Sequence, residues 1–458
     1  MAAVARTSTR HPIRRIVDQS ASMVGFAVGC AVRFRDFGRQ DAARRKANAV
    51  WLRESLQRLG PTYIKLGQFV TSRSDIFDAE IIDALELLQD NVEPIAQEDV
   101  RRIVAAASTA SDVRTFQLVP IASASIGQVH VAELADGRQI AVKVRRPGIA
   151  ADLSRDVGML RFLFDLASRF RDPEQTRAAG VLLDDFRSAT LLEADFTNEV
   201  SNMLKFEAAL RSGPWPSMLT QRAVVVPRPI TAMCDADAIV MELVPSRKVG
   251  SFLGEDPGVR RQLAYDVMDL FIGMMFFHGI VHGDPHEGNI GVNDAGAIVL
   301  YDFGNMISID AALRVRMKAA LFEIISGNID GLVDVLNAME VVRVKDESAL
   351  RRYMALYLKY LETVDVAEFS VAAMQGQAHE SLSTMPIELD GNVFQIMRAF
   401  AVVEGVCKKI DPEFAYGPLF AKYMAVCFQD SDVMQYKARS DVRNLTRQFL
   451  AWVEAPGA

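Results

Sequence analysis

The spacing of apolar positions separates helical segments from a short stretch that is rich in β-forming residues. Leu52, Leu56 and Leu59 recur at the spacing of a helix that ends at Gly60. Another helix is expected beyond Asp78, because aspartate is a preferred residue at a helix N-cap. We therefore predict that the N-terminal part of the chain is helical.

The periodicity changes near residue 119. Residues 127–134 alternate in polarity, an Asp-Gly turn follows, and residues 139–144 form the next expected strand. Further strands are predicted at 224–226 and 239–243, and helices are predicted between 151 and 210. The chain is expected to be mostly helical beyond residue 260, except for a strand–turn–strand at 289–301.

Composition narrows the class of protein. A chain of 458 residues with 50% hydrophobic and 24% charged residues is expected to fold, with two lobes or two to three domains. The four cysteines lie far apart, so we expect neither a disulfide framework nor a zinc site, and a reducing compartment is the default.

Charge is unevenly distributed along the chain. Residues 1–58 hold twelve Arg or Lys and four Asp or Glu, a net charge of +8, which leaves −15 for the remainder of a chain whose total is −7. A basic arm on an acidic body favours an anionic membrane surface as partner. Nucleic acid is not expected, because basic and aromatic residues do not alternate.

The N-terminal region does not decide where in the cell the protein is located. No run of about 20 apolar residues is present, so no membrane-spanning helix is expected. Residues 21–32 are apolar but too short to span, and are either a shallow anchor or a packed helix. The first seventeen residues lack acids, as do organelle transit peptides and some bacterial N-termini. An intracellular protein that associates peripherally with a membrane is predicted, either in a mitochondrion or plastid or in a bacterium.

The strongest chemical signal is a set of polar residues in the order found in phosphoryl-transfer enzymes. Lys143 lies at the end of a predicted strand, and Asp284 follows His282 and Gly283. Asn289 comes five residues after Asp284, and Asp302 opens an Asp-Phe-Gly sequence eighteen residues after it.

Each of these residue types has a role in such a reaction. Lys143 can neutralise phosphate charge, and Asn289 and Asp302 offer the hard oxygen ligands that magnesium prefers. Asp284 would act as base or orient an acceptor hydroxyl. The signal therefore predicts binding of ATP or ADP with Mg²⁺. Two other interpretations remain: unrelated surface residues, and a metal site at His282 and His286, which Pro285 disfavours by interrupting a helix.

The chain departs from ordinary protein kinases at several points. The glycine-rich phosphate loop is replaced by residues 121–128, in which Gly127 is the only glycine. Gly283 stands where arginine is usual, and no Ala-Pro-Glu follows Asp302, so control by activation-loop phosphorylation is not expected. The acid that would pair with Lys143 is Glu199, 56 residues further on.

Together these features resemble the UbiB/AarF-type atypical kinases linked to coenzyme Q and other prenylquinones. The matching segments are the Lys-x-Gly-Gln at 65–68, the Ala-rich loop at 122–125, Val142-Lys143, Glu193-Ala194-Asp195, Glu199, the loop at 282–289, Asp-Phe-Gly at 302–304, Glu404-Gly405 and Asp411-Pro412. The resemblance implies a bilobal protein-kinase-like α+β fold. It has a small N-lobe sheet, a mainly helical C-lobe and an N-terminal helical extension that covers the active site.

The resemblance also implies roles that the residues alone do not give. Lys65 would contact Glu193 and Asp195, and Gln68 would lie near the nucleotide. The covering extension leaves little room for a protein substrate, so ATPase activity and lipid or quinone-precursor handling are implied, together with quinone-biosynthesis proteins as partners. The Ala-rich loop would favour ADP and restrain kinase activity. The nucleotide-contacting set is Ala122, Ser123, Ala124, Ser125, Lys143, Glu242, Lys65, Gln68, Glu193 and Asp195.

We predict a basic arm at 1–58, the Lys-x-Gly-Gln extension at 59–118, an N-lobe at 119–248 with inserted helices at 151–191, and a C-lobe at 249–451. The main functional prediction is an ATPase-like kinase that supports isoprenoid quinone synthesis at a membrane. A small-molecule phosphotransferase and a non-catalytic pseudokinase scaffold are the alternatives. The phosphoryl acceptor and oligomeric state stay open.

Overall fold

The computed structural model divides the chain into two compact units. It describes residues 12–34, 37–71, 77–88, 94–106, 112–124, 126–169, 173–212, 222–339, 341–363, 387–389, 391–439 and 441. Unit 1 comprises residues 1–197 and 232–240, and unit 2 comprises residues 198–231 and 241–458. The boundary therefore falls within strand β6 (Ala238–Glu242) and at the start of helix α8 (Phe196–Ser212).

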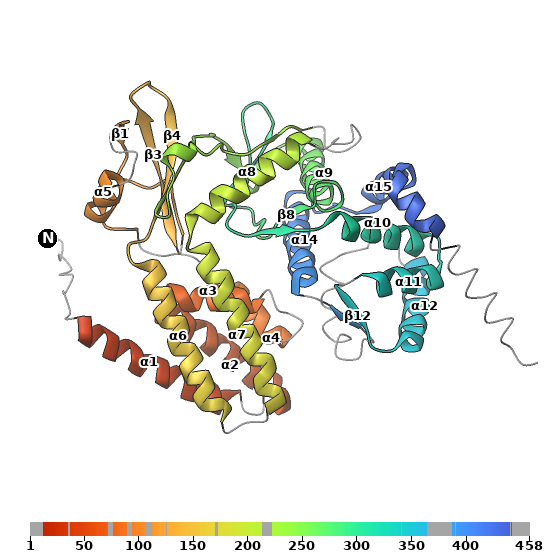
Figure 1. Cartoon of the computed structure of the whole chain (residues 1–458), viewed down its shortest axis with the longest axis horizontal. Coiled ribbons are helices and arrows are strands. Elements are labelled where there is room, and N and C mark those ends of the chain that lie inside the picture. The colour runs from red at the N-terminus through yellow and green to blue at the C-terminus, as the bar shows by residue number, and fades with distance from the viewer. Residues whose placement is uncertain are drawn as a thin grey trace, which may run out of the picture. The chain divides into compact units, whose positions relative to one another are not determined.

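Unit 1 begins with a group of helices (Figure 1). Helix α2 ends where the sequence predicts it, because Gly60 adopts a φ of 108° and Pro61 starts the next helix. Asp78 occupies the N-cap position of α4, but its side chain makes no capping hydrogen bond there. The helices are α1 (Pro12–Arg33), η1 (Phe37–Arg39), α2 (Ala42–Leu59), α3 (Pro61–Thr71), α4 (Ala79–Glu86) and α5 (Gln97–Ala106).

An apolar core holds these helices together. Leu56, Tyr63 and Leu85 are among its buried members, and Leu163 of α6 packs against it. Gly67 of the Lys-x-Gly-Gln segment is needed for this packing, because a Cβ there would lie 2.2 Å from Leu88 Cδ1. The motif's glycine thus serves the fold of the helical extension.

The apolar segment 21–32 both packs and remains exposed. Met23 is buried in the core, and a Cβ on Gly29 would lie 2.5 Å from the Trp51 ring of α2. The opposite face presents Val24, Val28 and Val32, which are 49%, 58% and 71% exposed. One face of α1 therefore packs, and the other carries an apolar stripe.

A five-stranded sheet completes unit 1. Strands β3 (Gly127–Leu134) and β4 (Gln139–Arg145) form the predicted hairpin, with Val129 opposite Lys143. The strand order is β1-β3-β4-β6, with β1 at Val113–Phe116, and β2 (Ala122–Ser123) pairs with β3. The predicted inserted helices are α6 (Ile149–Ser168) and α7 (Pro173–Glu193), which run side by side (Figure 1).

Unit 2 contains a second, four-stranded sheet. The predicted hairpin after residue 289 consists of β9 (Ile290–Val292) and β10 (Ile298–Leu300). Strand β5 (Val224–Val225) pairs in parallel with β10, and β7 (Arg247–Lys248) pairs with β9. Two strand pairs stand apart from this sheet: β8 (Ile280–His282) with β11 (Met306–Ser308), and β12 (Val342–Val344) with β13 (Ile387–Leu389).

The remainder of unit 2 is helical, as expected. Its elements are η2 (Thr231–Met233, shared with unit 1), η3 (Val249–Gly254), α9 (Pro257–Gly273), the π-helical segment η4 (Met274–His278), α10 (Ala311–Ile325), α11 (Ile329–Ala338), α12 (Glu347–Thr363), α14 (Gly391–Ile410) and α15 (Gly417–Gln429). The tail motifs connect α14 to its neighbours. Glu404 is buried and accepts a hydrogen bond from Tyr416, which precedes α15, and Arg261 of α9 forms an ion pair with Asp411 just after α14.

Candidate functional site

The loop after β8 is held by a buried histidine. The backbone N–H of Asp284 donates to His282 Nδ1 at 3.2 Å, and His282 Nε2 lies 2.8 Å from the carbonyl oxygen of Tyr301. Because Nδ1 accepts, the proton is on Nε2, which donates to Tyr301, and the ring is neutral. Burial lowers the pKa of His282, which agrees with a neutral ring. His282 therefore joins the start of this loop to the end of β10.

Asn289 lies at the other end of the same loop. Its side-chain N–H donates to the carbonyl oxygen of Asp284 at 3.0 Å, and its backbone carbonyl accepts from Tyr301. Since the amide nitrogen is used within the loop, the side-chain oxygen is the atom that faces away from that bond. An amide oxygen on a buried, fixed side chain is a suitable ligand for a hard cation.

Asp302 occupies a strained backbone position. It is the only residue other than glycine with positive φ (57°) in the described part of the chain. The next residue, Phe303, is buried and packs against the rings of Phe206 and His282, at centroid distances of 5.5 and 5.7 Å. The buried phenylalanine thus fixes the turn on which the exposed Asp302 stands.

Helix α8 binds both backbone groups of Phe303. Glu199 Oε1 accepts from the Phe303 N–H at 3.3 Å, and Asn202 Nδ2 donates to the Phe303 carbonyl at 2.9 Å. Glu199 is buried within unit 2, so its described role there is to hold the Asp-Phe-Gly turn. The pattern that singled out Glu199 gave no indication of Asn202.

A residue that the sequence did not indicate lies beside Asp284. Arg398 of α14 places a guanidinium nitrogen 3.9 Å from Asp284 Oδ1. Lys409 on the same helix forms an ion pair with Glu287 at 2.6 Å. No motif marks these basic residues, because an amphipathic helix carries solvated cations in many folds. They give the loop a basic border within unit 2.

Close packing explains why Gly283 occupies the position at which a protein kinase has arginine. A Cβ at this position would lie 2.7 Å from the side-chain amide of Asn305, whose backbone carbonyl accepts from the Gly283 N–H at 2.9 Å. The glycine therefore allows the loop and the segment after Asp302 to approach closely.

In unit 1, Lys143 lies on β4 and the Ala-rich loop begins on β2, and both strands pair with β3. The Lys143 ammonium is 5.3 Å from the centre of the Phe196 ring, and Lys143 is half-buried on β4. Ala122 and Ser123 form β2, and Ala124 donates its N–H to the carbonyl of Gly127 at 2.8 Å. Ser125 lies outside the described residues.

Arg146 fixes this loop by hydrogen bonds from its side chain and its backbone. Its guanidinium donates to the carbonyl oxygen of Ala124 at 3.1 Å and to Ser123 Oγ at 3.2 Å, and its backbone N–H donates to Ile126 at 2.7 Å. Burial lowers the pKa of Arg146. An arginine directly after a strand is ordinary in sequence, so nothing marked this residue beforehand.

The single glycine of the loop is required by close packing. A Cβ on Gly127 would lie 2.6 Å from the carbonyl oxygen of Val144 and 3.1 Å from Phe196. The backbone of β3 can approach β4 at this point only because the side chain is absent.

The Lys-x-Gly-Gln segment contacts Glu193 of the acidic motif, whereas the implied contact of Lys65 with Asp195 stays a prediction. Lys65 of α3 forms an ion pair with Glu193 at the end of α7. Asp195 accepts from the backbone N–H and hydroxyl of Thr197, at 3.0 and 2.7 Å, which caps the start of α8. Gln68, also on α3, accepts at its carbonyl from the Thr71 hydroxyl.

Glu242 contributes no described side-chain contact to either site segment. It is exposed at the end of β6, and its backbone N–H donates to the Arg228 carbonyl at 3.0 Å. Its expected contact with nucleotide stays a prediction.

Neither a metal cluster nor a membrane-spanning helix is found among the described residues. They contain no group of three or more His, Cys, Asp or Glu placed to hold a metal, so the His282–His286 interpretation gains no support. Within the same residues, no helix has the length and apolar character needed to cross a bilayer.

The lysine-bearing antiparallel sheet of unit 1, and the His-Gly-Asp loop and Asp-Phe-Gly turn of mainly helical unit 2, define a protein-kinase-like chain. Residues 87–336, more than half of the sequence, match the ABC1 atypical kinase-like domain. The chain belongs to this family, whose members include the UbiB/AarF-type kinases. The family and fold predicted from sequence are thereby confirmed.

Bacterial and chloroplastic proteins are among the relatives. An uncharacterized Synechocystis protein is 30% identical over 81% of this chain and 64% of its own length. The chloroplastic protein Activity of bc1 complex kinase 7 of Arabidopsis thaliana is 29% identical over 83% of this chain, which spans only 54% of that relative.

A solved structure has the same fold. The Mycobacterium tuberculosis protein Rv3197, determined with erythromycin, superposes with a TM-score of 0.56 at 20% identity, covering 76% of this chain and 88% of its own. At that identity the likeness concerns the fold alone.

Proposed function

We propose that this chain is an atypical kinase-like ATPase that binds ATP or ADP with Mg²⁺ and supports isoprenoid quinone synthesis or lipid handling at a membrane. The observation that carries the proposal is the fixed geometry of the Asp302 turn. A non-glycine residue is kept at positive φ by a buried phenylalanine whose two backbone groups are both bonded to α8. Such strain persists where the position of a side chain matters.

The donor set fits magnesium. Asn289 and Asp302 offer an amide oxygen and a carboxylate, and magnesium commonly takes few protein ligands together with phosphate oxygens and water. When bound, the ion would neutralise charge that develops on the transferred phosphoryl group. The protein's own contribution is to fix both oxygens: Asn289 through Asp284, and Asp302 through Phe303.

Asp284 is the proposed acceptor-side carboxylate. Its backbone is anchored by His282 and Asn289, and its side chain remains partly exposed. In the proposed reaction it orients water or a hydroxyl group and accepts its proton. Arg398, 3.9 Å away, can bind a phosphate oxygen. Lys143 supplies positive charge to the nucleotide, and Arg146 keeps the loop at 122–126 in place.

Restricted access is the proposed basis of ATPase rather than protein-kinase activity. The Lys65–Glu193 ion pair anchors the Lys-x-Gly-Gln helix within unit 1. The Ala-rich loop lacks the glycines that let a backbone wrap phosphates. The quinone pathway is proposed from the resemblance to UbiB/AarF-type kinases.

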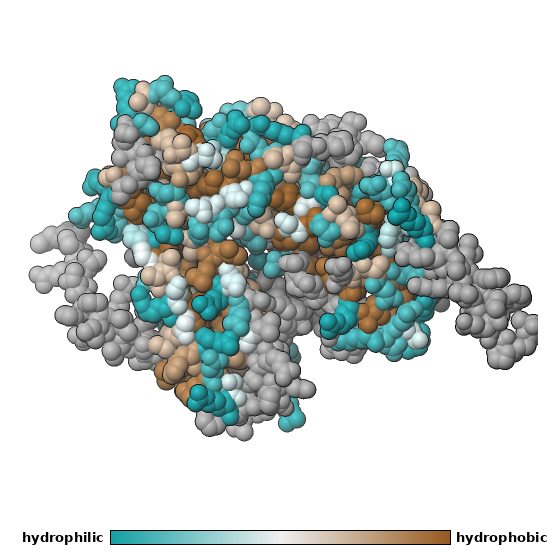
Figure 2. All heavy atoms as spheres, in the orientation of Figure 1, coloured by the Kyte–Doolittle hydropathy of each residue, from teal (hydrophilic) through white to brown (hydrophobic). Residues whose placement is uncertain are grey.

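Membrane contact is proposed for α1. Its stripe of Val24, Val28 and Val32 is exposed, and the first 58 residues carry a net charge of +8. An apolar helix face next to basic residues is the combination that binds anionic interfaces. Figure 2 shows further apolar surface over α6, where Phe162 and Leu166 are exposed.

The test is phosphate release from MgATP by the full chain, with anionic liposomes and a phenol-type quinone precursor. The wild type should turn over, and Asp302→Asn should abolish turnover. Asp294→Asn is the matched control, since Asp294 is an exposed carboxylate in the turn between β9 and β10. Asp284→Asn should lower the rate by about 10²-fold or more.

Other outcomes favour the alternatives. Rescue of a quinone-deficient strain by an Asp284→Asn, Asp302→Asn double variant would show that catalysis is not needed, and would favour the non-catalytic scaffold over the enzyme. Stoichiometric phosphorylation of a small hydroxylated molecule would favour a phosphotransferase over an ATPase.

A further inference from the structure

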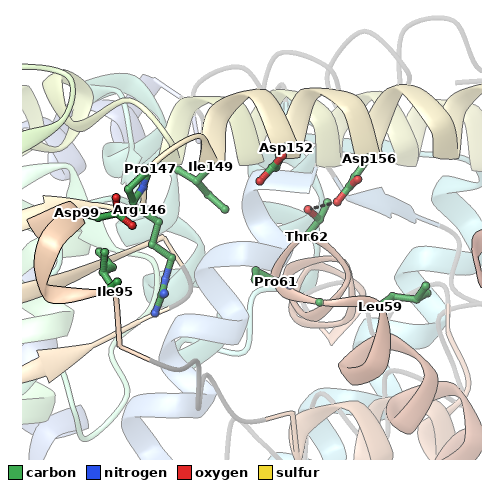
Figure 3. Close-up of a pocket in the computed structure, with 12 residues that line it drawn as sticks. Leu59, Pro61, Thr62, Ile95, Asp99, Arg146, Pro147, Ile149, Asp152 and Asp156 are labelled. Atoms are coloured by element: carbon green, nitrogen blue, oxygen red, sulfur yellow. Dashed lines mark hydrogen bonds between the residues drawn. The ribbon is translucent and has the colours of Figure 1, made fainter. Parts of the chain in front are cut away.

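A pocket in unit 1 has no residue of the predicted site set in its lining. It has a volume of about 450 Å³, is partly open to solvent, and is lined by the α2–α3 junction, the start of α5, the chain after β4 and the first turns of α6 (Figure 3). Pockets of this size hold small organic molecules. Its lining residues are Leu59, Gly60, Pro61, Thr62, Ile95, Ala96, Asp99, Arg146, Pro147, Ile149, Asp152 and Asp156.

The lining is amphipathic. Leu59, Pro61, Ile95, Pro147 and Ile149 provide an apolar wall. Against this wall stand three carboxylates and one guanidinium, so the pocket as a whole is acidic. An apolar wall with a few converging polar groups is the ordinary composition of a small-molecule site.

The three carboxylates of the pocket differ in how readily they can pair with a ligand. Asp156 is buried and accepts from the Thr62 hydroxyl at 2.7 Å, which fixes it between α6 and α3 (Figure 3). Asp152 pairs with Arg155 at 2.8 Å, and Asp99 pairs with Arg102, and neither arginine lines the pocket. Exposed pairs three residues apart contribute little to stability, so Asp152 and Asp99 can exchange these partners for a ligand at small cost.

The cation in the lining, the Arg146 guanidinium, already forms hydrogen bonds outside the pocket. The Arg146 guanidinium donates to Ala124 and Ser123 of the Ala-rich loop. A ligand beside Arg146 therefore touches the residue that holds this loop. Any displacement of Arg146 would release two hydrogen bonds that fix the loop.

We propose that this pocket binds a small organic cation, an ammonium group on a compact apolar body, and that Arg146 couples its occupancy to the Ala-rich loop. The ammonium pairs with Asp152, and the apolar body lies on the wall of leucine, proline and isoleucine. Asp99 adds negative charge at the other end of the pocket (Figure 3). An anion of the same shape is rejected by the carboxylates. The coupling rests on the proposed nucleotide role of the loop, whereas the binding does not.

The probe is adamantan-1-amine, with adamantan-1-ol and adamantane-1-carboxylate as neutral and anionic analogues of the same shape. A rigid body loses little conformational freedom on binding. Calorimetry on the full chain at constant ionic strength should show the amine binding about tenfold more tightly than the alcohol, and no binding of the carboxylate.

Variants locate the site. Asp152→Asn should weaken the amine about tenfold and leave the alcohol unchanged, because only the charge pairing is lost. Asp165→Asn, on the same helix but outside the pocket, should change neither. Equal affinity for amine and carboxylate, or full amine affinity in an Asp99→Asn, Asp152→Asn double variant with an unchanged melting temperature, would overturn the proposal.

Coupling is tested by ADP affinity with and without the amine. The wild type should show a shift, and by reciprocity ADP should shift amine affinity by the same factor. Arg146→Gln should still bind the amine and should lose the shift. Amine binding with an unshifted ADP affinity in the wild type would refute the coupling. If the chain binds no nucleotide at all, amine binding and its dependence on Asp152 still test whether the pocket is a cation site.

Discussion

At the scale of single residues, the structure explains why particular glycines stand in the motifs. Gly127 allows β3 to approach the backbone of β4, where a Cβ would lie 2.6 Å from a carbonyl oxygen that cannot move independently. Gly158, in α6, faces open space, with no atom within 4 Å of the position that a Cβ would take. Identical substitutions at these two positions should therefore have opposite effects.

Gly127→Ala should lower the free energy of unfolding by about 1–3 kcal/mol through overpacking. Gly158→Ala should raise it by about 0.5–1 kcal/mol, because alanine restricts the unfolded chain and favours a helix. Urea unfolding midpoints measure both. Shifts of the same sign would contradict the packing assigned to Gly127.

His282 predicts a dependence of stability on pH. Burial lowers its pKa in the folded state, so the unfolded chain binds the proton more readily. Its contribution is complete above the unfolded pKa of about 6.5, and it is lost as the pH falls below that value, by up to about 1.4 kcal/mol per pH unit. Burial also lowers the pKa of His130 and of His278, and both act in the same direction.

Unfolding in urea between about pH 5 and 7.5 tests this. His282→Gln should reduce the slope of unfolding free energy against pH and retain the parts due to His130 and His278. Identical slopes in wild type and variant would mean that His282 does not titrate differently on folding.

At the scale of elements, the sequence predicted those with local signals. The hairpin of β3 and β4 has an Asp-Gly turn between alternating strands, and the hairpin of β9 and β10 has an Asn-Asp-Ala-Gly turn. The helices α6 and α7 followed from periodicity. These features depend on neighbours in the chain, so pattern reasoning reaches them.

Contacts between distant segments were out of reach. Strand β5 has two residues and pairs with β10, with Val224 opposite Ile298, and no local pattern specifies that partner. Arg398 meets Asp284 across more than a hundred residues. Asn202 and Arg146 carry side chains common on any surface, so only the folded chain reveals their bonds to Phe303 and Ala124.

Helix α1 carries the prediction at this scale. The triple variant Val24→Ser, Val28→Ser, Val32→Ser removes the exposed apolar stripe and leaves Met23 on the packed face. Binding to anionic vesicles, measured by co-sedimentation, should weaken by about tenfold or more.

Val259→Ser on α9, where valine is also exposed, is the control and should bind as the wild type does. Unchanged vesicle binding by the triple variant, with its melting temperature preserved, would remove α1 from the proposed membrane contact.

At the scale of the whole molecule, the proposed roles in nucleotide binding are distributed over both units. Lys143 belongs to unit 1, whereas Asn289 and Asp302 belong to unit 2. A ligand bound only by the folded chain stabilises it in proportion to the logarithm of its concentration relative to its dissociation constant. Nucleotide should therefore raise the melting temperature only when magnesium is present, since Asn289 and Asp302 are assigned to the ion.

Titration calorimetry of MgADP into the full chain tests the central claim most directly. The account predicts saturable binding by wild type and Asp294→Asn, and its loss in Asp302→Asn, with all three proteins folded. Absence of binding by the wild type, or equal affinity in Asp302→Asn, would contradict it.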